Sequence, residues 1–179
     1  RKIEALTVFL PRKDMKIGFG AIGKGYAADR AKQVLVERGV LGGIINASGD
    51  INTWGTKPDG SSWTIGIVNP MNNKKVFSWF SLEQNAVVTS GDYEKFTEIN
   101  GKRYSHIIDP RTGIPSQGIV SCTVFAGKAE LADAIATAIF VMGVESGLFL
   151  IDQLPNIEAI LIDDSGMIHH SKNIKIEEN

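Results

Sequence analysis

The run from Leu131 to Met142 constrains the fold of this chain more than any other segment, because nearly all of it is apolar. Such a run predicts a buried helix. Its only polar residues are Asp133 and Thr137, whose i, i+4 spacing places them side by side on one helix face. A buried carboxylate is costly unless it is paired or binds a cation, and two oxygen ligands one turn apart suit Mg²⁺. In the alternative interpretation, Asp133 caps the helix and Thr137 bonds the carbonyl four residues earlier.

Length and composition limit the classes of protein to consider. With 179 residues, 43% of them apolar and 22% charged, the chain predicts a single ordinary globular domain over residues 1–179. A net charge of −1 argues against a nucleic-acid partner, and the apolar runs are too short to span a bilayer. The single cysteine, Cys122, excludes an internal disulfide and a cysteine-cluster metal site. It lies in a strand-like run, which favours a buried structural thiol over a catalytic one.

Strand patterns outnumber helix patterns along the chain. Helices are predicted at Gly25–Gly39, Ala129–Met142 and Val144–Leu154. Single strands are predicted at Ile3–Leu10, Gly42–Ile51, Trp63–Val68, Val76–Leu82, Ala86–Thr89 and Val120–Phe125. Two hairpins are predicted, one from Phe96–Ile99 and Arg103–Ile108 and one from Ile157–Ile162 and Met167–His170. Because many strands are adjacent in sequence, we expect the α+β class, with a mainly antiparallel sheet and flanking helices.

A glycine-rich stretch, Gly18–Tyr26, opens the first predicted helix. Closely spaced glycines let the backbone approach a phosphate, and a helix N-terminus attracts negative charge. Lys24 could add a point charge for a diphosphate. The stretch is neither a Walker loop nor a clean dinucleotide fingerprint, so on its own it is weak evidence for phosphate binding.

His106 is the histidine best placed for chemistry, since His169 and His170 fall in the terminal hairpin and are expected at the surface. It alternates with apolar residues, so it is either a satisfied strand histidine or a group for proton transfer near neutral pH. Asp109, directly before Pro110, is expected to fix a turn.

Two polar loops, Ser48–Asp50 and Ser90–Asp92, directly follow apolar strands. Strand ends are common ligand-binding edges, but Ser, Gly and Asp are also ordinary turn residues. A Ser–His–Asp triad stays open as an alternative, although the chain has no nucleophile elbow.

Taken together, these segments resemble the FAD:protein FMN transferase family, also called ApbE-like. The resemblance runs from about Ile17 to about Leu161. It rests on five segments, in order along the chain: Gly20–Asp29, Asn46–Ile51, Thr89–Tyr93, Tyr104–Gly113 and Ala132–Ala138.

The resemblance implies a set of site residues. A divalent metal, usually Mg²⁺, would be held by the side chains of Asp133 and Thr137 and by the backbone carbonyl of Ala21. His106 would be the catalytic residue for flavin transfer. The FAD-binding positions would be Gly18, Lys24, Ile107 and Ile108.

The resemblance also implies an activity: FMN moves from FAD to a threonine of a partner protein, and AMP is released. Two departures from the family pattern stand out. The family usually carries Asp where this chain has Gly18, and the chain lacks the family's N-terminal region. The alternatives are therefore a metal-dependent FAD diphosphatase and a truncated binding or scaffold relative that has lost catalysis. We further expect an extracytoplasmic, bacterial location, and self-association that buries a surface made of the strand after Arg1 and the faces near the glycine turn.

Overall fold

The computed structural model describes residues 7–174 apart from 69, 72–74, 83–84, 93–95 and 100–101. Its helices are α1 (Gly23–Glu37), α2 (Ala129–Met142) and α3 (Val144–Ile151), each close to its predicted range. Within the described ranges, no helix is both long enough and apolar enough to cross a membrane.

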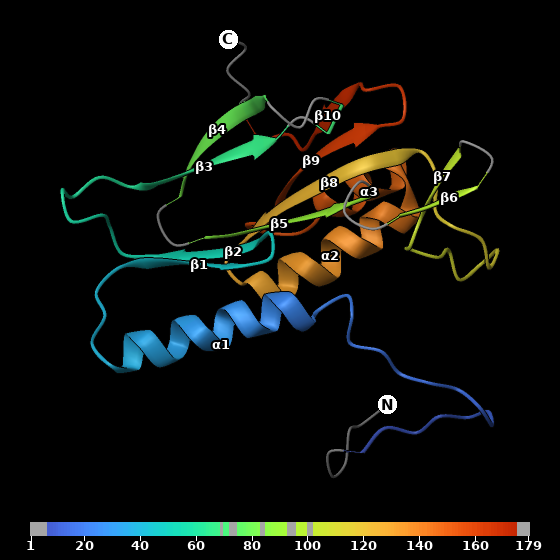
Figure 1. Cartoon of the computed structure of the whole chain (residues 1–179), viewed down its shortest axis with the longest axis horizontal. Helices are drawn as coiled ribbons and strands as arrows, with labels where there is room; N and C mark the ends of the chain where they lie inside the picture. The colour runs from blue at the N-terminus through green and yellow to red at the C-terminus, as the bar shows by residue number, and fades with distance from the viewer. Residues whose placement is uncertain are drawn as a thin grey trace.

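A six-stranded sheet forms the centre of the protein (Figure 1). Its strands in spatial order are β1 (Gly43–Ala47), β2 (Asp50–Trp54), β5 (Ala86–Gly91), β8 (Ile119–Ala126), β9 (Glu158–Asp163) and β10 (Ile168–His170). Two further hairpins are β3 (Trp63–Val68) with β4 (Val76–Leu82), and β6 (Phe96–Ile99) with β7 (Lys102–Ser105). All of these strand pairs are antiparallel, which confirms the predicted α+β class.

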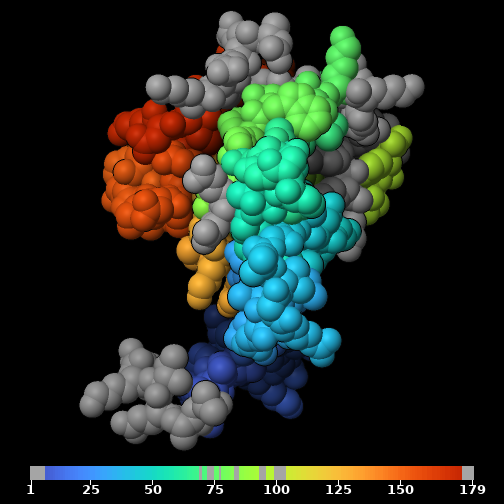
Figure 2. Space-filling view, turned by 90° about the vertical axis from the view of Figure 1, so that its left-hand side faces the viewer, coloured from blue at the N-terminus to red at the C-terminus, as the bar shows by residue number. Residues whose placement is uncertain are grey.

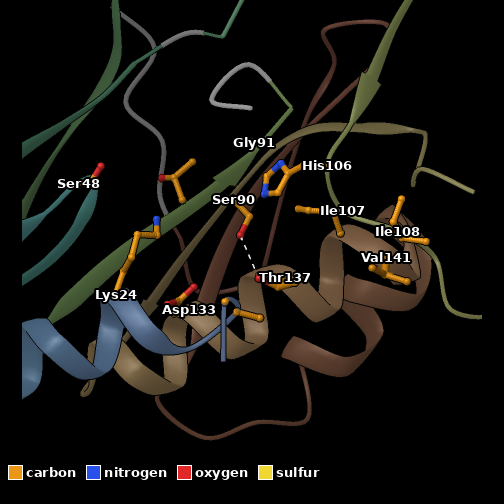
Figure 3. Close-up of a pocket in the computed structure, with 13 residues that line it drawn as sticks. Lys24, Ser48, Ser90, Gly91, His106, Ile107, Ile108, Asp133, Thr137 and Val141 are labelled. Carbon is orange, nitrogen blue, oxygen red and sulfur yellow. Dashed lines mark hydrogen bonds between the residues drawn. The ribbon is translucent and has the colours of Figure 1, made fainter. Parts of the chain in front are cut away.

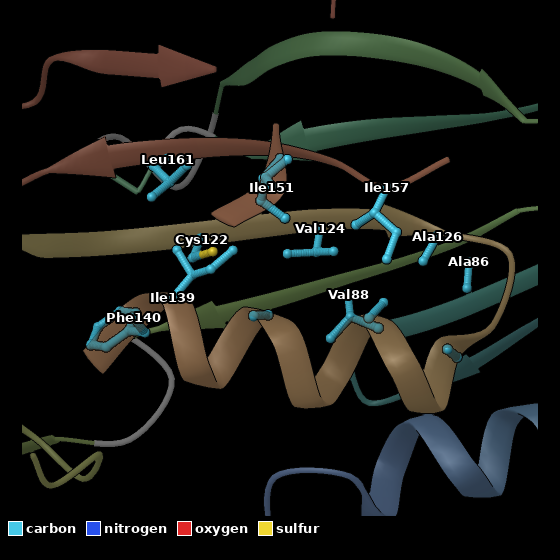
Figure 4. Close-up of a cluster of buried hydrophobic side chains, with 14 of the residues drawn as sticks. Ala86, Val88, Cys122, Val124, Ala126, Ile139, Phe140, Ile151, Ile157 and Leu161 are labelled. Carbon is cyan, nitrogen blue, oxygen red and sulfur yellow. The ribbon is translucent and has the colours of Figure 1, made fainter. Parts of the chain in front are cut away.

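The two faces of the sheet pack against different layers, as the alternation of side chains along a strand requires. On β5, Val88 packs into the core formed with α2, whereas Val87 joins the core under the β3–β4 hairpin. On β8, Val124 faces the α2 side and Phe125 packs its ring against Phe80 of β4, with centroids 5.0 Å apart. Figure 4 shows α2 lying along the first of these faces.

Helix α2 buries one continuous stripe against the sheet. The stripe follows the 3.6-residue helical period and consists of Ala129, Ala132, Asp133, Ala136, Ile139 and Phe140. The carboxylate of Asp133 therefore lies on the core-facing side of the helix. Cys122 lies under the same helix with no exposed surface, which confirms the structural thiol, and burial raises the pKa of that thiol.

Three strand predictions need correction. Thr7–Leu10 forms no strand, and residues 3–6 lie outside the described ones; the stretch 7–20 runs away from the helices (Figures 1 and 2). The predicted strand Gly42–Ile51 is two strands, because Ser48 and Gly49 adopt φ angles of 57° and 98° and reverse the chain. The strand expected to reach Ile108 ends at Ser105, and Ile108 makes only an isolated bridge to Pro115.

Candidate active site

A cavity of about 500 Å³ lies where the N-terminus of α1 meets α2, the end of β5 and the loop after β7 (Figure 3). This volume is typical of small-molecule sites. The residues that line the cavity are Gly20, Ala21, Lys24, Ser48, Thr89, Ser90, Gly91, His106, Ile107, Ile108, Asp133, Thr137 and Val141.

All but one of the site residues expected from the sequence line this cavity. The predicted metal ligands Ala21, Asp133 and Thr137 line the same cavity as Lys24 and His106. These five residues come from three separate parts of the chain. The exception is Gly18, which lies in the exposed stretch before α1 with no other atom within 4 Å of a Cβ placed on it. Its contact with FAD stays a prediction.

Helices α1 and α2 each supply the N-terminal cap of the other. Neither helix has a side-chain cap at its own N-cap residue. Asp133 of α2 accepts a hydrogen bond from the Gly25 N–H through Oδ2 at 3.1 Å. Asp29 of α1 accepts from the Ala129 and Glu130 N–H groups at 2.9 and 3.1 Å. Both carboxylates therefore satisfy backbone donors that a helix start leaves open, and both lie at the positive end of a helix dipole.

Gly25 permits this exchange because the two helices touch there. A Cβ at Gly25 would lie 2.3 Å from the carbonyl oxygen of Ala129, well inside van der Waals contact. The glycine turn therefore has a packing role at this position, in addition to any role in binding phosphate.

The buried carboxylate of Asp133 and the hydroxyl of Thr137 are oxygen ligands of the kind that bind a divalent cation. Asp133 is 3% exposed and accepts from the start of α1 through only one of its oxygens. Thr137 lies one turn along the helix, with its Oγ1 3.5 Å from Ser90 Oγ. Nowhere in the described ranges do three His, Cys, Asp or Glu side chains gather to hold a metal. A cation here would therefore depend on hydroxyl and carbonyl oxygens as well, which is the donor set that Mg²⁺ prefers.

Lys24 forms an ion pair with Asp50, the first residue of β2, with Nζ and Oδ1 2.7 Å apart. Asp50 has no exposed surface, and among the described residues its Oδ2 has no hydrogen-bond partner. Burial and the neighbouring Asp133 carboxylate raise the pKa of Asp50 and the Lys24 ammonium lowers it, which together give a pKa of about 7.

The loop after β7 carries His106 and the two isoleucines over the cavity. Asp109 organises this loop as predicted: its carboxylate accepts from the Arg111 backbone N–H at 2.8 Å and its carbonyl accepts from Gly113. The guanidinium of Arg111 also donates to the Val141 carbonyl in the last turn of α2. This contact holds the loop against the helix that carries Asp133, and His106 projects towards Ser90 (Figure 3).

The sequence profile of the ApbE family matches residues 1–161. The chain belongs to the ApbE family. It is 35% identical to an FAD:protein FMN transferase of Treponema pallidum over 178 residues, which cover 94% of this chain and 49% of that protein.

Solved structures of ApbE proteins have the same fold. The ApbE protein of Thermotoga maritima superposes with a TM-score of 0.82 and 37% identity, covering 88% of this chain and 52% of that one. The apo form of the flavinyl transferase ApbE of Pseudomonas stutzeri gives a TM-score of 0.76 and 33% identity, covering 88% and 50%. The chain thus spans about half the length of these ApbE relatives.

Among the residues that line the cavity or lie beside it, the sequence left the roles of Ser48, Asp50 and Ser90 open and did not indicate Val141. Ser48 and Ser90 follow strands at the sheet edge, a signal that also fits ordinary turns. Val141 resembled any other apolar position of α2. Asp50 resembled a turn residue, because its burial becomes visible only once β1 and β2 are paired across the Ser48–Gly49 turn.

Proposed function

We propose that this chain carries the part of an FAD:protein FMN transferase that binds the diphosphate and the catalytic cation. The reaction transfers FMN from FAD to a threonine hydroxyl of a partner protein and releases AMP, with Mg²⁺ as the cation. One observation carries this proposal: a single cavity brings together Asp133, Thr137 and Ala21 with Lys24 and His106. The names of the Treponema and Pseudomonas relatives supply the substrates.

The residues of the cavity suit this chemistry. The threonine oxygen attacks the phosphorus of the FMN half, the bond from that phosphorus to the AMP oxygen breaks, and AMP leaves. Asp133, Thr137 and the Ala21 carbonyl would hold a divalent cation, which would supply neutralisation of the charge on the diphosphate oxygens. Lys24 adds a positive charge on the side of α1, and Ile107 and Ile108 offer apolar surface to the flavin. His106 accepts the proton of the attacking hydroxyl.

The test is incubation of the chain with FAD, Mg²⁺ and a peptide that contains one threonine, beside a matched peptide with valine in its place. We expect the threonine peptide alone to gain the mass of an FMN group, with one AMP released per transfer. AMP without a gain in peptide mass would instead identify an FAD diphosphatase. Neither product would indicate a relative without catalysis.

His106→Ala should slow transfer by about 10²–10⁴-fold, the usual contribution of a general base. The matched control is His169→Ala, because His169 pairs with Asp163 in the terminal hairpin and does not line the cavity. Equal loss of activity in both variants would contradict the role of His106.

We propose that the protein acts outside the cytoplasm of a bacterium.

We also propose that the protein associates with a second copy through the stretch 7–20. This stretch exposes large apolar side chains, namely Val8, Phe9, Leu10, Met15, Ile17 and Phe19. Where exposed apolar side chains gather into a large patch, the patch marks an interaction site. Light scattering should give the mass of a dimer for the unaltered chain and of a monomer for Phe9→Ser combined with Phe19→Ser. A monomer before substitution would refute self-association.

A further inference from the structure

Asp50 is a buried acid beside the cavity to which neither the sequence motifs nor the proposed reaction assign a role. It is fully buried at the start of β2. One of its two oxygens, Oδ1, accepts a hydrogen bond from the Lys24 ammonium group. The other oxygen, Oδ2, is buried and, among the described residues, has no hydrogen-bond partner. An unpaired buried acceptor is unfavourable, so its retention at this place requires an explanation.

The charges around Asp50 do not balance. Asp50 and Asp133 are two enclosed carboxylates, 0% and 3% exposed, and they lie close enough for Asp133 to act on Asp50. Lys24 forms the ion pair with Asp50, while the Gly25 N–H that faces Asp133 carries only a partial charge. Among the described residues, Lys24 is the one full positive charge placed against these two acids, so a further cation would be favoured beside them.

The Lys24 side chain lies within reach of two negatively charged groups, the Asp50 carboxylate and a diphosphate in the cavity. Its Nζ is 2.7 Å from Asp50, yet the side chain is 38% exposed and lines the cavity where a diphosphate would lie. A lysine is a compact charge on a flexible stem, so it can move between an acid and a phosphate without any change in the backbone.

We propose that Asp50 is the second carboxylate of the cation site, and that arrival of the cation releases Lys24 from Asp50 towards a phosphate. In the cation-free protein, Lys24 partly neutralises the two acids. When a divalent cation is held by Asp133 and Thr137, it takes over that neutralisation, and the ion pair between Lys24 and Asp50 weakens. This inference rests on the proposed function, since it assumes a cation and a diphosphate at this site.

The inference predicts effects of opposite sign for the two partners of one ion pair. Asp50→Asn should weaken cation binding by about tenfold or more, because a negative charge is lost next to the cation. Lys24→Met should strengthen cation binding several-fold, because a competing positive charge is lost. If Asp50 served only to orient Lys24, neither substitution would change cation affinity in the absence of FAD.

The experiment is a Mn²⁺ titration of the FAD-free chain, with unbound Mn²⁺ measured by electron paramagnetic resonance. Asp164→Asn is the matched control, because it removes an exposed acid in the β9–β10 turn and should leave affinity unchanged. Thermal unfolding checks that each variant is folded. Should Asp50→Asn fail to fold, the rise in affinity for Lys24→Met still tests the inference.

The outcomes separate this inference from the proposed function. Loss of Mn²⁺ binding in Asp133→Asn, combined with unchanged affinity in both Asp50→Asn and Lys24→Met, would overturn the role of Asp50 and leave the transferase proposal intact. No Mn²⁺ binding by the unaltered chain, or full binding by Asp133→Asn, would instead remove the cation from the proposed reaction.

Discussion

Gly25→Ala is expected to destabilise the protein by about 3 kcal/mol, the upper end of the cost of overpacking a core. The added methyl group would lie 2.3 Å from the Ala129 carbonyl oxygen, and backbone atoms cannot rotate away as a side chain can. Helices α1 and α2 must therefore separate, which also lengthens the hydrogen bond from Gly25 to Asp133. Urea unfolding followed by circular dichroism measures the change.

Gly23→Ala is the control for that measurement. Gly23 lies in the same first turn of α1, has no atom within 4 Å of the place a Cβ would take and does not adopt a positive φ. Alanine there should be neutral or stabilising by up to about 1 kcal/mol, because it favours the helix over the unfolded chain. Equal unfolding free energies for the two variants would contradict the close approach of α1 and α2.

Asp133→Asn should lower the rate of FMN transfer at least about a hundredfold while leaving the fold intact. Even residues that only support a metal ligand cost about 10–100-fold when replaced, and Asp133 is proposed as a ligand itself. The amide keeps an oxygen to accept from the Gly25 N–H, and loss of the Asp133 charge removes its repulsion with the Asp50 carboxylate. Activity assays at saturating FAD and thermal unfolding of the same samples test both parts.

Thr137 offers a second test of that cation site. Thr137→Ser keeps the hydroxyl and should retain most of the activity, whereas Thr137→Val keeps the shape and removes the oxygen ligand. If Asp133→Asn transferred FMN at the rate of the unaltered chain, neither residue would serve a catalytic cation.

The sequence predicted well those features that depend on neighbouring residues. The apolar pattern of α2 predicted both its bounds and the burial of Asp133, because the residues on the buried face of a helix recur at the helical period. Short strand-like runs likewise predicted β5 and β8, which the structure confirms. Both signals come from residues within a few positions of one another.

The errors arose where the structure of a segment depends on residues far from it in the sequence. Ile3–Leu10 has a strand-like composition, but a strand also needs a partner edge, and Thr7–Leu10 pairs with none of the described strands. The capping interpretation of Asp133 was incomplete, since Asp133 caps a different helix from its own, at a residue 108 positions away in the sequence, and its role as a cation ligand stays a prediction. The burial of Asp50 was not predicted for the same reason, because it depends on how β2 packs and not on the turn that precedes it.

The exchange of caps between α1 and α2 has a consequence for how such a site can change over evolution. Asp133 joins the proposed cation site to the backbone of Gly25, and Gly25 is the neighbour of Lys24. A substitution that shifts the start of α1 to suit a different flavin nucleotide therefore also moves a cation ligand. Substrate preference and cation affinity cannot be adjusted separately here, so variants selected for one property should carry changes in the other.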